Sequence, residues 1–227
     1  MLQLQYMHEY HLSRIKQYSP LSELNTQRFR CAEFDTIDWK TSYAMIGCSH
    51  VFGVGNDIEN TIPYILTEIT NTHCVNLGTS GSSRELTFFN AMNILQQTEV
   101  KKVIIIWTYP RRIDTYTNEG YISLNQRIDL KSSSARQRKK IQELQNRAMY
   151  TIYSDTHFHL LTRQYGNILK RDYADRILLL NILDLEQEFG GDSNSWLGPK
   201  DTAKDKKHYG PIWNRKVANK IKDQLND

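Results

Sequence analysis

"KVIIIWTY" (residues 102–109) is an unbroken apolar run rich in β-branched and aromatic residues. Three more runs have the same character: "SYAMIGC" (42–48), "HCVNLG" (73–78) and "RILLLNIL" (176–183). A strand with one face in water alternates between apolar and polar residues, whereas these runs are continuous. They therefore predict parallel strands that are covered on both faces.

Segments with helical periodicity lie between these runs and after the last one. In "NTIPYILTEIT" (60–70), the apolar residues Ile62, Ile65 and Leu66 fall on one face, and Pro63 sits in the first turn, where its missing N–H costs little. The same spacing recurs in residues 82–97, 135–153 and 210–225. This alternation predicts an α/β fold, in which a mostly parallel sheet is sandwiched between helices joined by right-handed crossovers.

The chain shows no internal repeat and no composition that favours a second domain. We expect residues 1–40 to form an N-terminal extension packed on the core, and residues 41–227 to form one domain. Two polar, turn-rich stretches, 110–134 and 189–207, fit no regular element. They are interpreted as loops, or as a lid over a site.

Composition excludes several classes of function. The 29 basic and 25 acidic residues give a net charge of +4, too mild to require a polyanionic partner. The dense run "RQRKK" (136–140) is interpreted as a solvated helix face, so we expect no nucleic acid. No stretch reaches the ~20 apolar residues of a membrane span. The first residues lack the apolar core of a signal peptide, and three irregularly spaced cysteines favour a reducing compartment, so we expect a cytoplasmic protein without a membrane partner.

Ligands of parallel α/β sheets bind outside the carboxyl ends of the strands, so the residues that follow each strand are the candidates for a site. The first strand is followed by Cys48, Ser49 and His50. The second leads into "NLGTSGSS" (76–83), and the third ends in "WTYPRR" (107–112).

"DKKHYG" (205–210), just before the last helix, adds an acid and a base to these candidates. A serine nucleophile needs a base to accept its proton, and the base needs an acceptor that orients its ring. In a bent loop Asp205 can hold one nitrogen of His208 and leave the other facing Ser49. The turn in "NLGTSG" offers backbone N–H groups for an oxyanion.

Together, "GCSHVFGVG", "VNLGTSG" and "DKKHYG" resemble the SGNH (GDSL-type) hydrolases, in a form associated with phage genomes. The resemblance spans about residues 42–222. It implies a three-layer, flavodoxin-like α/β/α sandwich and a serine esterase or carbohydrate deacetylase. Ser49 then corresponds to the nucleophile, Asp205 and His208 to the terminal pair, and Gly81, or Gly78, to the oxyanion glycine.

The resemblance also implies a small-molecule or glycan ester as substrate and no metal or other cofactor. If the chain comes from a phage, we expect the protein to be located in the cytoplasm of the host cell. The oligomeric state has no signal in the sequence.

The sequence departs from the family in two blocks. Cys48 stands where the first block usually has aspartate, and the third block lacks its asparagine, an oxyanion donor. Thr108 or Tyr109 could offer a hydroxyl instead. Losing one such donor costs ~10²–10³ in rate. The alternative is therefore a binding or structural protein that kept the fold and lost the esterase chemistry.

Several residues keep two interpretations. Ser49 could cap the following helix, and Cys48 is either a buried residue or a nucleophile. His50 either contacts substrate or fills the turn. Arg111 and Arg112 either pair with Asp114 or Glu119 or clamp a substrate carboxylate or phosphate. Together with the glycine turn, they are the basis of a third hypothesis, an enzyme that acts on a nucleotide or another phosphate ester.

Two further features have weaker signals. His157 and His159 have the spacing of a metal pair on a strand, but no carboxylate or cysteine accompanies them, so they are interpreted as ordinary histidines. Trp196, in a polar loop, could stack on a sugar.

Overall fold

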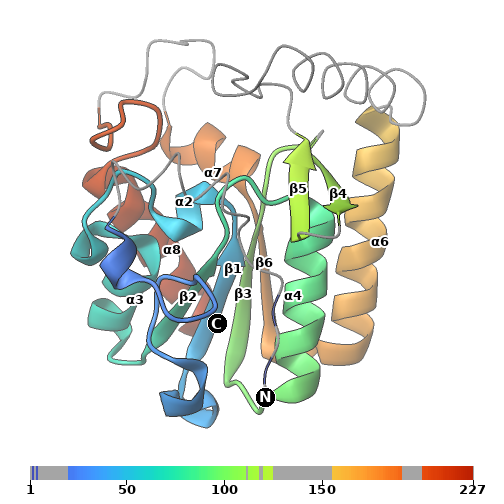
Figure 1. The fold of residues 1–227 in the computed structure, drawn as a ribbon, viewed down its shortest axis with the longest axis horizontal. Helices are drawn as coiled ribbons and strands as arrows, with labels where there is room; N and C mark the ends of the chain where they lie inside the picture. Colours follow the sequence, from blue (N-terminus) through green and yellow to red (C-terminus); the bar gives the residue numbers. More distant parts are fainter. Residues whose placement is uncertain are drawn as a thin grey trace.

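A parallel four-stranded sheet forms the centre of the computed structural model (Figure 1). The structure describes Leu2, Leu4 and residues 20–110, 112–117, 120–124, 155–190 and 201–226. The strands are β1 (Tyr43–Gly47), β2 (Cys74–Gly78), β3 (Lys102–Trp107) and β6 (Ile177–Asn181). Their order across the sheet is β2-β1-β3-β6, with every pair parallel.

This strand order places a topological switch point between β1 and β3. The chain passes from β1 to β2 on one side and then crosses to β3 on the other. Connections that leave a sheet in opposite directions open a crevice outside the carboxyl ends of the two strands. The first and third predicted strands are therefore the ones whose ends border a site.

Helices α4 (Arg84–Gln97) and α6 (Asp155–Tyr173) cover one face of the sheet (Figure 1). The buried core on this side includes Ala91, Ile94, Leu95, Val103, Ile105 and Leu169. Ser83 caps α4, because its hydroxyl accepts a hydrogen bond from the N–H of Leu86 at 3.1 Å.

Helices α3 (Ile62–Thr70), α7 (Ile182–Phe189) and α8 (Pro211–Asn226) cover the opposite face. Their core with the strands includes Met45, Ile62, Leu66, Ile104, Leu185, Val217 and Ile221. Strand residues alternate between the two cores, which explains why each run is apolar throughout. The predicted three-layer α/β/α fold is confirmed.

The four strands and three of the four predicted helices lie where the sequence placed them; the fourth helix, 135–153, falls outside the described residues. The run 176–183 was extended too far, because the chain turns at Asn181 and α7 begins at Ile182. The Asn181 side chain accepts a hydrogen bond from the N–H of Leu183 at 3.2 Å, which caps that helix.

The stretch 110–134 contains more structure than the predicted loop. Strands β4 (Ile113–Thr117) and β5 (Gly120–Leu124) form a separate antiparallel pair. "IDTYT" is short and has no regular alternation of apolar and polar residues, so these strands were missed. A lid over the site stays a prediction. Helix α6 was also missed, and His159 on it is exposed.

The segment before β1 packs against the core through short 3₁₀ turns: η1 (Leu21–Glu23), η2 (Phe34–Thr36) and η3 (Trp39–Thr41). Phe29 and Phe34 are buried in the core under α4. Arg30 is buried as well. The division at residue 40 stays a prediction.

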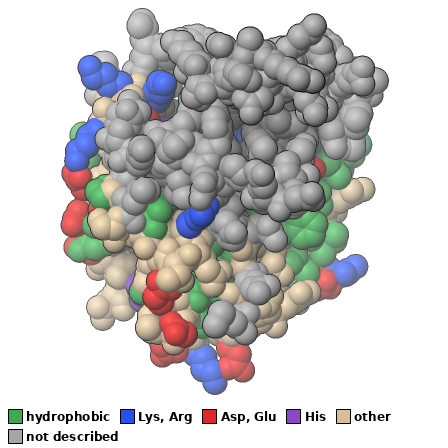
Figure 2. Space-filling model, viewed as in Figure 1, with side chains coloured by type: hydrophobic (Ala, Val, Ile, Leu, Met, Phe, Trp, Pro, Cys, Tyr) green, Lys and Arg blue, Asp and Glu red, His purple; other side chains and the backbone are tan. Residues whose placement is uncertain are grey.

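Apolar side chains also remain at the surface. Figure 2 shows hydrophobic side chains gathered on the right of this view, where Figure 1 draws α4 and α6. Phe89 of α4 and Leu160 of α6 are 50% and 53% exposed. No helix of the described residues carries an apolar stretch that could cross a membrane.

Candidate active site

The turn after β1 forms a short helix, α2 (Ser49–Phe52), with Cys48 at its N-cap. Ser49 is buried and is the first helical residue, so the alternative that Ser49 caps a helix does not hold. Cys48 is buried as well, as expected. This places Ser49 at the carboxyl end of β1, next to the switch point.

Gly78 fixes how closely α2 approaches the sheet. A Cβ atom at Gly78 would lie 2.2 Å from the backbone nitrogen of Phe52. The N–H of Gly78 donates to Asn76 Oδ1 at 3.0 Å and so has a partner already. Gly78 therefore serves close packing, and Gly81, which has φ +81°, is the glycine of the two that could offer an oxyanion donor.

Asp205 and His208 form a hydrogen-bonded pair before α8. His208 Nδ1 lies 2.6 Å from Asp205 Oδ2, and Asp205 Oδ1 accepts the N–H groups of Lys207 and His208 at 3.0 and 3.1 Å. Burial opposes ionisation of Asp205, but the hydrogen bonds and charge of His208 and the two N–H groups outweigh it and lower the pKa of the carboxyl. A carboxylate held in this way orients the imidazole.

Contacts between two turns bring this pair to the end of β1, some 150 residues away in the chain. The N–H of Lys204 donates to the carbonyl of Gly55 at 2.9 Å, and Asn56 Nδ2 donates to the carbonyl of Tyr209 at 3.0 Å. A Cβ at Gly55 would lie 3.1 Å from Asp205 Oδ1, and Gly55 has φ +79°. The second glycine of "GVG" thus lets the loop of Asp205 dock.

His50 lies against His208, with 5.2 Å between the ring centroids. The rings of Tyr209, Trp213 and Tyr109 also surround it at 5.4, 5.9 and 6.0 Å. Burial lowers the pKa of His50 far below its ordinary value, and the charges of His208 and Arg112 lower it further, against a smaller opposing effect of Asp205. His50 is therefore neutral, and it joins the Ser49 turn to His208.

Glu186 of α7 is a site residue that the sequence analysis missed. The hydroxyls of Tyr109 and Tyr209 both donate to its Oε1, the second at 3.1 Å. Burial raises the pKa of Glu186, and these two hydrogen bonds oppose the rise. The acidic run "DLEQEF" resembles an ordinary solvated helix, so nothing in the sequence marked this carboxylate.

The contact with Glu186 changes what is expected of Tyr109. A phenol has one O–H to donate, and that of Tyr109 is given to Glu186. His50 Nε2 lies 3.4 Å from the same phenol oxygen. Thr108 is therefore the better candidate for a hydroxyl donor: it is fully buried, and its Oγ1 has no hydrogen-bond partner among the described residues.

Of the two arginines after β3, the structure describes Arg112 but not Arg111. Arg112 Nη1 donates to the carbonyl of Ser82 at 3.4 Å, and its guanidinium lies 5.4 Å from the ring centre of Tyr109. The side chains of Asp114 and Glu119, its suggested partners, are not described. In the described part of the chain, no group of three metal-ligating side chains is placed to hold an ion.

The sequence matches no protein-family model and no curated protein. Among solved structures, it is similar to a protein assigned to the G-D-S-L family of lipolytic proteins from Desulfitobacterium hafniense, with 15% identity and a TM-score of 0.40 over 82% of this chain and 99% of the other. It is also similar to a psychrotrophic esterase from Pseudoalteromonas sp., with 13% identity and a TM-score of 0.41 over 82% of this chain and 100% of the other.

A third similar structure is that of a protein described as a GDSL-like lipase from Bacteroides ovatus. It shares 14% identity with this chain at a TM-score of 0.42, over 82% of this chain and 53% of the other. Likenesses of this size decide neither a family nor an activity. The function therefore has to be inferred from the geometry at the carboxyl ends of β1 and β3.

Proposed function

We propose that the protein is an ester hydrolase in which Ser49 is the nucleophile, His208 the general base and Asp205 the residue that orients the base. The observation that carries the proposal is the position of His208. Its Nδ1 is held by Asp205 at 2.6 Å, and its ring lies 5.2 Å from that of His50, the residue directly after Ser49.

The hydrogen bond to Asp205 decides which nitrogen of His208 acts. With Nδ1–H donated to the carboxylate, Nε2 carries the free lone pair. Nε2 accepts the proton of the Ser49 hydroxyl as its oxygen attacks the ester carbonyl. Asp205, with its lowered pKa, stays ionised and stabilises the imidazolium that forms.

The tetrahedral intermediate needs donors for its oxyanion. We assign this role to the N–H groups of Ser49 and Gly81 and to the hydroxyl of Thr108, in place of the asparagine that the family usually has. His208 then gives its proton to the leaving alcohol, and an acyl-Ser49 ester remains. Water, deprotonated by His208, attacks this ester and releases the acid.

The neutral state of His50 supports this mechanism. A charged imidazolium in contact with His208 would oppose the positive charge that His208 acquires as it accepts the proton. Burial prevents that by lowering the pKa of His50. Glu186 and Tyr109 hold the other side of the ring through the 3.4 Å contact between Tyr109 and His50 Nε2.

The substrate class stays a proposal of its own: an O-acyl group on a carbohydrate or another small ester. His50 and Arg112 are the described residues that we place on the substrate side of the site. Trp196, suggested as a surface for a sugar, lies outside the described residues.

Hydrolysis of p-nitrophenyl acetate tests the proposal. The wild-type protein should hydrolyse it, and we expect His208→Ala and Asp205→Asn to lower kcat by roughly 10⁴-fold. The control is His73→Gln, an exposed histidine whose Nδ1 lies 3.4 Å from Ser42 Oγ, before β1 and away from its carboxyl end. Turnover that survives in His208→Ala would rule out the mechanism, and no turnover by the wild type would favour a binding protein.

A further inference from the structure

Arg84, the first residue of α4, is a buried cation near the carboxyl ends of the strands, where the candidate active site lies. Its side chain reaches the end of β3. Nε donates to the carbonyl of Thr108 at 2.8 Å, and Nη1 donates to Thr162 Oγ1. The residue is only 5% exposed, and Nη2 has no hydrogen-bond partner among the described residues. The guanidinium thus has donors left over in a place where water is excluded.

No carboxylate of the described ranges offsets the charge of Arg84. Burial lowers its pKa, and no charged neighbour in the described part of the chain contributes to the shift. Arginine is almost never buried without a partner, because the cost of removing the charge from water has to be offset. Arg30, which is also buried, shows the usual arrangement: its guanidinium is paired with Glu23 at 2.5 Å.

Two more unsatisfied groups lie at the carboxyl ends of the strands that neighbour β1. Thr79 Oγ1 and Thr108 Oγ1 are buried without partners, directly after β2 and β3, on either side of β1. Together with Arg84 they account for three of the five unsatisfied buried side-chain atoms in the described residues. Buried polar groups without partners are rare in native proteins, so three at one edge indicate a missing polar ligand.

The surroundings favour a ligand with negative charge. Arg84 begins a 14-residue helix, whose amino end carries partial positive charge. Arg112 also lies close to this turn, since its Nη1 donates to the carbonyl of Ser82, two residues before Arg84. The turn 79–84 is therefore bordered by two guanidiniums.

We infer that Arg84 binds an anionic oxygen group of the substrate, a carboxylate or a phosphate, with the Thr79 hydroxyl as a second donor. The group belongs to a substrate only if the proposed esterase function is right. Thr108 keeps its role at the oxyanion, and the hydrogen bond from Arg84 to its carbonyl places the anion next to the reacting ester. The preferred substrate is then an ester that carries a negative charge.

Calorimetric titration with acetate and with inorganic phosphate tests the binding without using catalysis. Both wild-type protein and Ser49→Ala should bind at least one of the two anions saturably, whereas chloride at the same ionic strength should not compete. Binding of acetate alone, of phosphate alone or of both shows which oxygen group the site accepts. We expect Arg84→Gln to weaken binding by about tenfold to a hundredfold, as for the loss of a hydrogen bond to a charged group.

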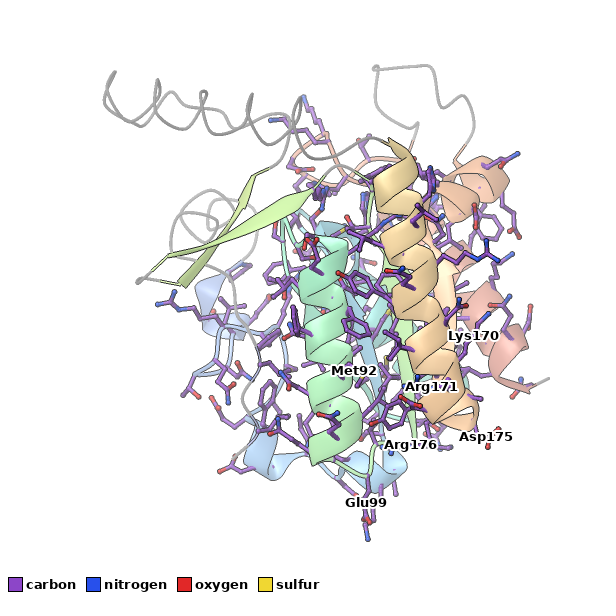
Figure 3. All side chains as sticks on the ribbon, turned by 90° about the vertical axis from the view of Figure 1, so that its right-hand side faces the viewer. Met92, Glu99, Lys170, Arg171, Asp175 and Arg176 are labelled. Atoms are coloured by element: carbon purple, nitrogen blue, oxygen red, sulfur yellow. The ribbon has the colours of Figure 1, made fainter. Side chains whose placement is uncertain are left out.

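Arg176→Gln is the matched control. Arg176 also donates to main-chain carbonyls, those of Leu95, Thr98 and Val100, but at the far end of α4 (Figure 3). The Arg176→Gln variant should bind the anion with the same affinity as the wild type. Equal binding by Arg84→Gln, or no saturable binding by the folded wild type, would overturn the inference. If Arg84→Gln does not fold, Arg84→Lys, which keeps the charge but loses the planar fork, should bind more weakly.

A pair of esters separates this inference from the proposed function. The wild type should hydrolyse the p-nitrophenyl monoester of succinate, which keeps a free carboxylate, with a higher kcat/KM than p-nitrophenyl acetate. That ratio should fall about tenfold or more in Arg84→Gln. Saturable anion binding without hydrolysis of either ester would reject the esterase and leave Arg84 as an anion site; hydrolysis without a preference for the charged ester would reject the subsite alone.

Discussion

His50 shows at the scale of one residue how burial sets a charge state. The pKa of His50 is far below 6.5 in the folded protein, because the ring is desolvated and lies beside His208 and Arg112. In the unfolded chain it returns to about that ordinary value. As the pH falls below 6.5, His50 becomes protonated in the unfolded state but stays neutral in the folded state. The folded state therefore loses stability relative to the unfolded state.

This predicts a slope in the free energy of unfolding against pH. The His50 contribution should be fully present above pH 6.5 and lost at up to about 1.4 kcal/mol per pH unit below it. Urea unfolding of His50→Gln between pH 5 and 7 should show a smaller slope than the wild type. His73→Gln should change the slope less, since His73 is exposed and the pKa of its ring is lowered less. Equal slopes for wild type and His50→Gln would contradict a neutral, buried His50.

A pair of glycines tests the packing of α2 on the sheet. In Gly78→Ala the new methyl group would lie 2.2 Å from the Phe52 nitrogen, so the variant should lose about 3 kcal/mol of stability or fail to fold. In Gly166→Ala, inside α6, the nearest atom is Leu179 Cδ1 at 3.6 Å, and helix propensity should add about 0.5–1 kcal/mol. Thermal unfolding measures both, and a tolerated Gly78→Ala would contradict the close approach.

At the scale of elements, Arg30 holds the turn that carries the site. Its Nη1 donates to the carbonyl of Gly53 at 2.9 Å, and its Nη2 donates to that of Asn56 at 2.9 Å, while Nε donates to Glu23 at 2.6 Å. The segment before β1 thereby fixes the turn on which the loop of Asp205 docks. Residues 20–42 are part of the support of the site.

Arg30→Gln should therefore destabilise the protein by about 3 kcal/mol, since it leaves carbonyls and Glu23 without a partner in a buried place. It should also lower the proposed esterase activity, because the turn positions both Ser49 and the Asp205 loop. Arg171→Gln is the control: Arg171 pairs with Asp172 on the surface of α6 (Figure 3) and its loss should leave unfolding unchanged. An Arg30→Gln protein as stable as the Arg171→Gln protein would contradict this role.

The elements that the sequence predicted well are those with a strong local pattern. The four strands are continuous apolar runs, and α3, α4 and α8 repeat apolar residues at helical spacing. Helix α7 was missed because its apolar start continues the run of β6 without a break. The end of that strand depends on the Asn181 cap, a signal of one residue.

At the scale of the whole molecule, the site was predictable as far as it follows the order of strands. Ser49 and Thr108 became candidates because they come directly after strands, and Asp205 and His208 because of their spacing. Glu186 and Arg84 could not be found in this way. Their roles depend on contacts with Tyr109, Tyr209, Thr108 and Thr162, which are remote in sequence, and an isolated charge in a helix usually faces water.

Covalent labelling with a fluorophosphonate probe tests the central claim most directly. We expect one probe per chain by intact mass, located at Ser49 by peptide mapping. Labelling should be lost in Ser49→Ala and strongly slowed in His208→Ala, because only a serine with a nearby base attacks the phosphorus at neutral pH. A wild-type protein that stays unlabelled, or a Ser49→Ala variant labelled as fast as the wild type, would contradict the account.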